Sequence, residues 1–470
     1  MINLKSSTPT FILEPQIFAF LFLLAYGRIK LYVILQKGCK IMRTLIKHGH
    51  VLDPKTQRDE VCDVLIEDDR IVKVDSDIVS EADRTVDATG CYVMPGFIDL
   101  HVHLRDPGLE YKETLQTGGQ AGARGGITTI CAMPNTKPVM DTGEKVSEVH
   151  RRSRTESPVN VIQLGAITVG QKGEELADIE GMAKAGCHAV SEDGKSVMNA
   201  SLYRQAMKQA KENNISIFAH CEDLTMVEGG VMNADEKAKK LGLKGITNAV
   251  EDVIVARDIL LAKETGVQLH LCHCSTADSV KMVAEAKKEG LPVTAEVCPH
   301  HFILTTEDIP EDDGNYKMNP PLRSREDVEA LKEGLRNNIM DVIATDHAPH
   351  SAEEKNKSMK DAMFGIVGLE TSSALTYTEL VDKGILTPMQ MAEKMSYNPA
   401  KILGIAGEKG SVSEGMIADI VIFDPKREYR IDKNTFLSKG KNTPFDNYAV
   451  KGDVRYTFVD GKMVYENTAY

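Results

Sequence analysis

The chain has 470 residues, of which 42% are hydrophobic and 27% are charged, so it can bury a sizeable core and is unlike a disordered protein. Its formal net charge is −13 without any extended run of Lys or Arg, which argues against nucleic acid as the main partner because phosphate binding needs a concentrated basic surface. An acidic total still allows a locally basic pocket, so a small anionic substrate fits the composition. The nine cysteines show no disulfide-like framework, which favours reduced thiols and a cytoplasmic protein.

Residues 1–41 differ from the rest of the chain. The apolar run from Ile17 to Ala25 is too short to span a bilayer comfortably; a signal-peptide core is the alternative, although no convincing cleavage site follows it. Met42 then begins the segment MRTLIKHGHVLDP, which is typical of the first strand of a domain. We therefore expect residues 1–41 to be a non-native or dispensable extension, and we expect no membrane association for residues 42–470.

The two ends of the remaining chain share β character. Residues 44–93 contain short alternating runs that are separated by polar turns, with no long helical period. After about Gly404 the runs MIADIVIFDP and VRYTFVDGKMVYE, the second with an Asp-Gly turn, are again typical of strands. These patterns predict one small β-sandwich domain, built discontinuously from residues 42–94 and 405–470.

Residues 95–404 alternate between strand-like apolar runs and helix-patterned stretches, which is typical of βα units around a parallel sheet. Eight such runs with intervening helices predict an α/β fold with a closed (β/α)8 TIM-type barrel. In chain order the runs are FIDLHVHL, TTICAMPN, VNVIQLGAI, CHAVSED, SIFAHCE, QLHLCHCS, VTAEVCPHH and DVIATDHAPH.

Polar residues gather at the C-terminal ends of these runs, where the βα loops of a barrel enzyme converge on the catalytic mouth. His101 and His103 close the first run, and strand alternation places both on one side. Neutral imidazoles are good ligands for zinc, although an isolated His-x-His pair is as often two hydrogen-bonded histidines beside a turn.

Three further residues at strand ends favour a metal centre. His220 ends the fifth run, His273 ends the sixth, and Asp346 ends the eighth. Chance placement of this whole set at strand ends is improbable, so the pattern predicts ligands that gather around one axis. His300 and His301, after the seventh run, are interpreted as packing or hydrogen-bonding residues.

Six segments together resemble one known family. HVHLRDPG, AMPNT, AHCED, YKMNPPLR, ATDHAPH and SKGKNTPF resemble dihydroorotases of the amidohydrolase superfamily, in the bacterial-type class I, and the resemblance runs from about Met42 to the C-terminus. It implies reversible interconversion of (S)-dihydroorotate and N-carbamoyl-L-aspartate in de novo pyrimidine (UMP) biosynthesis. It also implies a homodimer, and some members of the family associate with aspartate carbamoyltransferase.

The resemblance further implies a centre of one or two zinc ions per subunit, with two favoured. His101 and His103 would hold one ion together with Asp346. His220 and His273 would hold the second ion. The nucleophile would be a metal-activated hydroxide.

A carboxylate at the end of the fourth run would bridge the two ions. Asp193 matches the family position, while the adjacent Glu192 competes for the role, and strand alternation allows only one of them to face the centre. Lys195, if carboxylated, is a further alternative, although its place beyond the strand end favours a solvated loop residue.

Substrate recognition is expected to depend on Arg105, which lies beside the first ligand pair. A planar guanidinium can bind a carboxylate through two parallel hydrogen bonds, and the alternative is an ordinary salt bridge with Asp106 or Glu110. The resemblance assigns Asn135 and His350 to the same substrate carboxylate.

The resemblance also implies how the ring is bound and opened. Asn319 and the backbone of Phe364 and Gly365 would contact the ring edge. Asp346 would act as the acid and base that moves the proton between nucleophile and leaving nitrogen, the alternative being a simple metal ligand. Ring opening then needs an ionised Asp346 and ring closure a protonated one, so hydrolysis should rise with pH and cyclisation should fall.

Two rival functions remain at this point. An allantoinase or a hydantoinase-type cyclic amidase would share the scaffold, but Arg105 and the absence of a lysine at the fourth strand end count against it. A non-catalytic homologue that serves as a structural partner should lack the metal ligands, all of which are present in this chain.

Overall fold

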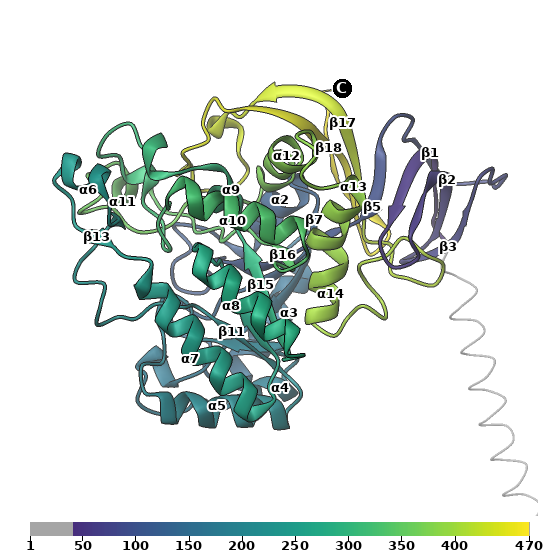
Figure 1. The fold of residues 1–470 in the computed structure, drawn as a ribbon. Helices are drawn as coiled ribbons and strands as arrows, with labels where there is room; N and C mark the ends of the chain where they lie inside the picture. Colours follow the sequence, from purple (N-terminus) through teal and green to yellow (C-terminus); the bar gives the residue numbers. More distant parts are fainter. Residues whose placement is uncertain (1–40, 470) are drawn as a thin grey trace, which may run out of the picture.

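The computed structural model describes residues 41–469 (Figure 1). The expected N-terminal extension therefore lies, apart from Ile41, outside the described residues. Figure 1 shows a sheet formed by both ends of the described chain and, beside it, a body in which helices surround a set of interior strands.

One eight-stranded sheet joins the two ends of the described chain. Its strands are β1 (Arg43–Asp53), β2 (Arg58–Glu67), β3 (Arg70–Asp75), β4 (Arg84–Asp87), β5 (Tyr92–Pro95), β17 (Ile420–Arg430), β18 (Ala449–Val459) and β19 (Lys462–Glu466). The order is β19-β18-β17-β5-β1-β2-β3, and β4 pairs with β1. Val93 on β5 lies opposite Ile422 on antiparallel β17, so residues before and after the α/β part share one sheet and one buried core.

The middle of the chain forms two larger parallel sheets, with orders β6-β7-β8 and β16-β15-β14-β11-β10-β9, and a small parallel pair of β12 (Met232–Asn233) and β13 (Gly245–Ile246). Their strands are β6 (Phe97–Val102), β7 (Ile127–Ala132), β8 (Asn160–Gln163), β9 (Gly165–Ala166), β10 (Ala189–Ser191), β11 (Ser216–Ala219), β14 (Leu269–Leu271), β15 (Val293–Val297) and β16 (Val342–Ile343). Each predicted run contains a strand, and the third contains both β8 and β9. The predicted α/β class with parallel strands is therefore confirmed.

The two larger parallel sheets adjoin each other at two places. Only Leu164 separates β8 from β9. On the other side, Val102 on β6 forms a parallel bridge with His347, which follows β16, and the His103 backbone N–H donates to the His347 carbonyl over 2.8 Å. The carboxyl ends of the first and last strands of the set therefore lie side by side.

Helices cover the strands from outside, for example α2 on β7, α5 on β11 and α8 on β15 (Figure 1). Side-chain caps begin several of them, such as Asn199 before α5 and Thr276 before α8. The helices are α2 (Leu115–Arg124), α3 (Gly143–Glu156), α4 (Ile179–Lys184), α5 (Ala200–Glu212), α6 (Glu236–Leu241), α7 (Ala249–Thr265), α8 (Ala277–Lys288), α9 (Pro299–Ile303), α10 (Arg325–Arg336), α11 (Ala352–Lys355), α12 (Ser372–Thr376), α13 (Pro388–Ala392) and α14 (Asn398–Ile402). Strands and helices thus alternate along the chain. The polar residues at the carboxyl ends of the strands lie in the loops that lead from each strand to the next helix.

Within residues 41–469 no helix combines the length and the apolar character that a membrane crossing needs. The eight cysteines of this part of the chain are all buried and carry free thiols. They contribute small apolar side chains to packing.

Candidate metal centre and substrate pocket

The six residues that the sequence singles out as metal ligands lie together. His101 is on β6, and the others follow the carboxyl ends of β6, β10, β11, β14 and β16 within three residues. All six side chains are buried. They are His101, His103, Asp193, His220, His273 and Asp346.

One half of this cluster contains two histidines and two acids. The Nε2 atom of His101 lies 3.0 Å from Oδ1 of Asp193. The Nε2 atom of His103 lies 3.1 Å from Oδ1 of Asp346 and 3.4 Å from Oδ2 of Asp193. Two imidazoles and two carboxylates thus converge on one small volume.

The other half contains two histidines that share Asp193. The Nδ1 atom of His220 faces Nε2 of His273 at 3.0 Å. Both nitrogens approach Oδ1 of Asp193, at 3.6 Å and 3.7 Å respectively. Asp193 therefore stands between the two halves, with one oxygen near nitrogens of both.

Hydrogen bonds behind the histidines turn specific nitrogens toward the centre. The Nδ1 atom of His101 donates to Glu296, which leaves Nε2 buried without a hydrogen-bond partner among the residues that the structure describes. The Nδ1 atom of His103 donates to Oδ1 of Asn135 over 2.9 Å, so its Nε2 is the unprotonated atom. Outer carboxylates and amides hold metal-binding histidines in this way. The donor set and its orphaned nitrogen therefore fit a divalent metal such as zinc.

The electrostatics of the two acids agree with a centre that holds ionised carboxylates. Burial alone would raise the pKa of Asp193, but the charges of His101 and His103 hold it well below its ordinary value. Burial would likewise raise the pKa of Asp346, and the adjacent imidazole of His103 together with the neighbouring His101 and His273 lowers it instead. Carboxylates bind a metal ion in their ionised form.

The competing residues at the end of β10 point elsewhere. Glu192 accepts hydrogen bonds from the backbone N–H groups of Ile167 and Thr168, at 3.1 Å and 3.0 Å. Lys195 is exposed, and its Nζ donates to the Gln171 carbonyl. The structure thus places neither residue in the cluster that contains Asp193.

Glu296 is a residue of the site that the sequence analysis did not single out. It lies on β15, is fully buried, and accepts from Nδ1 of His101 and Nε2 of His270, each over 3.0 Å. The backbone N–H of His273 donates to it as well. Burial opposes its ionisation, but these two imidazoles lower its pKa to about 2. The sequence does contain an indication of this role: Glu296 is an acidic residue inside the apolar run VTAEVC, and a buried charge requires partners.

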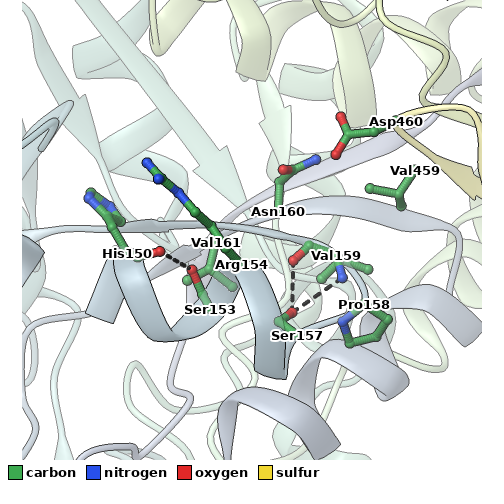
Figure 2. A pocket seen from close by; sticks show the side chains of 10 residues that line it. All are labelled: His150, Ser153, Arg154, Ser157, Pro158, Val159, Asn160, Val161, Val459 and Asp460. Atoms are coloured by element: carbon green, nitrogen blue, oxygen red, sulfur yellow. Dashed lines mark hydrogen bonds between the residues drawn. The ribbon is translucent and has the colours of Figure 1, made fainter. Parts of the chain in front are cut away.

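A pocket of about 520 Å³ opens onto the cluster. Its lining includes every residue predicted to contact substrate, namely Arg105, Asn135, Asn319, His350, Phe364 and Gly365. It also includes Lys317 and residues 360–363, which the sequence analysis did not name. A second pocket, of about 270 Å³, lies elsewhere and contains no predicted site residue; His150, Arg154, Asn160 and Asp460 are among its lining residues (Figure 2).

Arg105 is buried at the wall of the larger pocket and has no carboxylate within 4 Å among the described residues. Asp106 instead pairs with Arg152 at 2.7 Å, and Glu110 accepts from the Gly108 backbone. The local salt bridge that competed with substrate binding is therefore not formed. A buried guanidinium without an anionic partner is costly, which favours an anionic ligand beside it.

The two other predicted carboxylate contacts have their polar atoms engaged. Asn135 accepts from His103 and donates to Oδ2 of Asp193. His350 donates from Nε2 to the Phe364 carbonyl over 2.8 Å, and its Nδ1 lies 3.2 Å from Nζ of Lys112. Among Arg105, Asn135 and His350, only the guanidinium of Arg105 therefore has hydrogen-bond donors that no described residue uses.

The loop that carries Phe364 and Gly365 is held through its backbone. The Gly365 N–H donates to the Lys317 carbonyl over 3.0 Å, at a φ of 120° that favours glycine. Buried Lys355 donates to the carbonyls of Gly365, Met363 and Lys317 over 2.8–3.0 Å. These bonds fix the part of the pocket wall that residues 363–365 form.

His300 and His301 lie in α9 and are buried, in agreement with a packing role. Nε2 of His301 donates to the Pro320 carbonyl over 2.9 Å. Together with Cys298 they form a compact group of potential ligand atoms outside the six-residue cluster.

Comparisons with known proteins relate this chain to one family. Residues 90–279 match a family model described as Dihydro-orotase-like. A dihydroorotase of Ligilactobacillus salivarius is 49% identical over 428 residues, which is 90% of this chain and 99% of that protein. A dihydroorotase of Pelotomaculum thermopropionicum is 48% identical over 426 residues, covering 91% and 99% of the two chains.

Solved structures share the fold. An L-hydantoinase (dihydropyrimidinase) from Arthrobacter aurescens superposes with a TM-score of 0.81 at 28% identity, over 91% of this chain and 96% of that one. A dihydropyrimidinase from Brevibacillus agri gives the same TM-score and coverage at 25% identity. Because sequence relatives near 50% identity match over almost their full length, the chain belongs to the dihydroorotase family.

Proposed function

We propose that this protein is a dihydroorotase of the bacterial-type class I, which interconverts (S)-dihydroorotate and N-carbamoyl-L-aspartate in pyrimidine biosynthesis. Family membership supports the reaction class. The observation that carries the substrate assignment is Arg105, whose buried guanidinium faces the pocket with unused donors and without a carboxylate partner in residues 41–469. Dihydroorotate has a ring carboxylate to pair with it.

The proposed cofactor is zinc, with two ions per subunit. His101 and His103 would hold one ion together with Asp346, His220 and His273 would hold the other, and Asp193 would bridge them. When bound, zinc lowers the pKa of water to about 7 and polarises a carbonyl oxygen, which supplies nucleophile and electrophile for amide hydrolysis.

Asp346 would transfer the proton between water and the leaving ring nitrogen. Its Oδ1 lies 3.1 Å from Nε2 of His103, inside the cluster and on the pocket wall. An ionised carboxylate at this place can accept a proton as the ring opens and return it to the nitrogen. In ring closure the same group would begin protonated.

Arg105 would orient the substrate by binding its carboxylate through two parallel hydrogen bonds. Asn319 and the Phe364–Gly365 segment would border the ring, while Asn135 and His350 would support this arrangement. Fixing the scissile amide against the cluster supplies the proximity that a hydrolysis at neutral pH requires.

The proposal includes the architecture around this site. The two parallel sheets would form a closed (β/α)8 barrel over residues 95–404, supported by the bridge between Val102 and His347. Residues 42–94 and 405–470 would form a β-sandwich domain. A homodimer, and association with aspartate carbamoyltransferase, belong to the same proposal.

A hydantoinase-type cyclic amidase is the second candidate, because the solved structures named above carry that description. The experiment that separates the two follows absorbance while protein with a measured zinc content is mixed with dihydroorotate, hydantoin or allantoin. Turnover of dihydroorotate alone is the expected result. Turnover of hydantoin or allantoin without dihydroorotate would reject the proposed substrate.

A further inference from the structure

Glu222 lies between a proposed metal ligand and a proposed substrate contact. It follows β11 by three residues, and its side chain is buried against His220 and Asn319, which line the pocket. Its Oε2 is 3.3 Å from Nε2 of His220, and its Oε1 accepts from Nδ2 of Asn319 over 2.9 Å. One carboxylate thus contacts both functional groups.

The backbone holds Glu222 in this position. Its N–H donates to Oγ of Ser196 over 3.1 Å, and the same hydroxyl donates to the His220 carbonyl over 2.7 Å. Ser196 therefore ties residues 220 and 222 together after the strand, so that the carboxylate is oriented before substrate arrives.

The contact with His220 selects one tautomer of that imidazole. A carboxylate offers only acceptors, so Nε2 must carry the hydrogen and Nδ1 is left with a lone pair. That Nδ1 is the atom that faces His273 and Asp193. The outer carboxylate of a metal-bound histidine has this effect in other metal sites.

The contact with Asn319 selects one orientation of its amide. Because Nδ2 must face the carboxylate, Oδ1 is the remaining polar atom, and no described residue donates to it. Asn319 lines the pocket, so this oxygen is available to accept a hydrogen bond from a ring N–H of a cyclic amide.

We propose that Glu222 is a positioning residue that sets both the tautomer of His220 and the amide orientation of Asn319. The metal side and the substrate side of the pocket are thereby fixed by one carboxylate. This inference rests on the proposed function and deepens it, since it specifies an N–H donor as the substrate group that meets Asn319.

The test combines zinc retention with steady-state kinetics on the zinc-loaded protein. Glu222→Met removes both acceptors at similar size, and we expect about a 10- to 100-fold loss of zinc retention against a chelator. We also expect about a tenfold rise in KM for dihydroorotate. Asn319→Ala should raise KM alone, and adding Glu222→Met to it should raise KM no further.

Glu379→Met is the matched control, because it removes another buried glutamate, one that contacts Tyr448 and Lys383 outside the pocket lining. It should leave zinc retention and KM unchanged. Unaltered zinc retention and KM in Glu222→Met would overturn the inference, as would KM effects of Glu222→Met and Asn319→Ala that multiply fully.

If Glu222→Met does not fold, Asn319→Asp decides the question. It places a second carboxylate against Glu222, so KM should exceed that of Asn319→Ala, and an equal KM would overturn the inference. A wild-type protein that binds zinc but does not turn over dihydroorotate would instead reject the proposed function. An active wild type whose Glu222 variant keeps wild-type zinc retention and KM would reject this inference alone.

Discussion

Nη2 of Arg105 and Nε2 of His350 lie 3.4 Å apart, and both nitrogens carry hydrogens. His350 uses its Nε2 hydrogen on the Phe364 carbonyl, so it cannot accept from the guanidinium. Burial and the positive charges of Arg105 and Lys112 lower the pKa of His350 to about 3, which keeps the ring neutral. The pocket thus contains a buried positive charge, the Arg105 guanidinium, with hydrogen-bond donors available to an anion.

Replacing Arg105 should selectively weaken binding of a substrate that carries a carboxylate. Loss of charge-assisted hydrogen bonds costs about 1.5–3 kcal/mol, so Arg105→Lys should raise KM for dihydroorotate by about 10- to 100-fold. Arg154→Ala, a change at the second pocket, is the control and should leave KM unaltered (Figure 2). An Arg105→Lys protein with wild-type KM would show that the carboxylate binds elsewhere.

Asp346 should give opposite pH profiles to the two directions of the reaction. The histidines around it hold its pKa below the ordinary value, so the ionised form that ring opening needs persists into mildly acid solution. Ring closure needs the protonated form, so its rate should fall as pH rises. Initial rates in both directions across pH check this, and Asp346→Asn should lose about 10²- to 10⁴-fold in each. Coincident profiles would contradict the assignment.

Removing Glu296 should weaken metal binding more than folding. Glu296→Gln retains the size but cannot accept from both His101 and His270, so His101 loses its fixed orientation. We expect zinc retention against a chelator to fall about 10- to 100-fold. Asp258→Asn, a change at another buried acid that pairs with Arg257, should leave zinc retention intact. Equal retention in the two variants would remove Glu296 from the metal centre.

Lys355 should make stability depend on pH in the alkaline range. Burial lowers its pKa to about 7, whereas the unfolded chain keeps the ordinary value of about 10.4. The unfolded state then binds more protons between these values, so this lysine's contribution to stability becomes more favourable as pH rises from 7 to 10. Chemical denaturation of wild type and Lys355→Met at several pH values measures the difference.

The wild-type free energy of unfolding, relative to Lys355→Met, should increase across that window. Lys357→Met, at an exposed neighbour, should show no such trend. Because Lys355 also supports Gly365, the same variant should raise KM for dihydroorotate. A difference between wild type and Lys355→Met that is independent of pH would mean that the lysine does not titrate in this range.

The sequence predicted the strands and the cluster because local rules govern both. Apolar runs bounded by turns give the eight strand positions, and alternation along a strand brings His101 and His103 to one side. The same rule separates Glu192 from Asp193, which contact different partners just beyond β10.

The residues that support the cluster could not be read from the sequence in the same way. Glu296 meets His101 across 195 positions of the chain, and Glu222 meets Asn319 across 97. Such contacts depend on which strands and loops become neighbours in three dimensions. The place of the Asn135 amide between His103 and Asp193 likewise depends on the fold, while its contact with the substrate carboxylate stays a prediction.

The most direct test of the central claim is a crystal structure of zinc-loaded Asp346→Asn protein with dihydroorotate bound. The account predicts that the ring carboxylate lies within hydrogen-bond distance of the Arg105 guanidinium, with the ring edge toward Asn319. A ring carboxylate directed away from Arg105, or dihydroorotate bound outside the pocket beside the six-residue cluster, would contradict it.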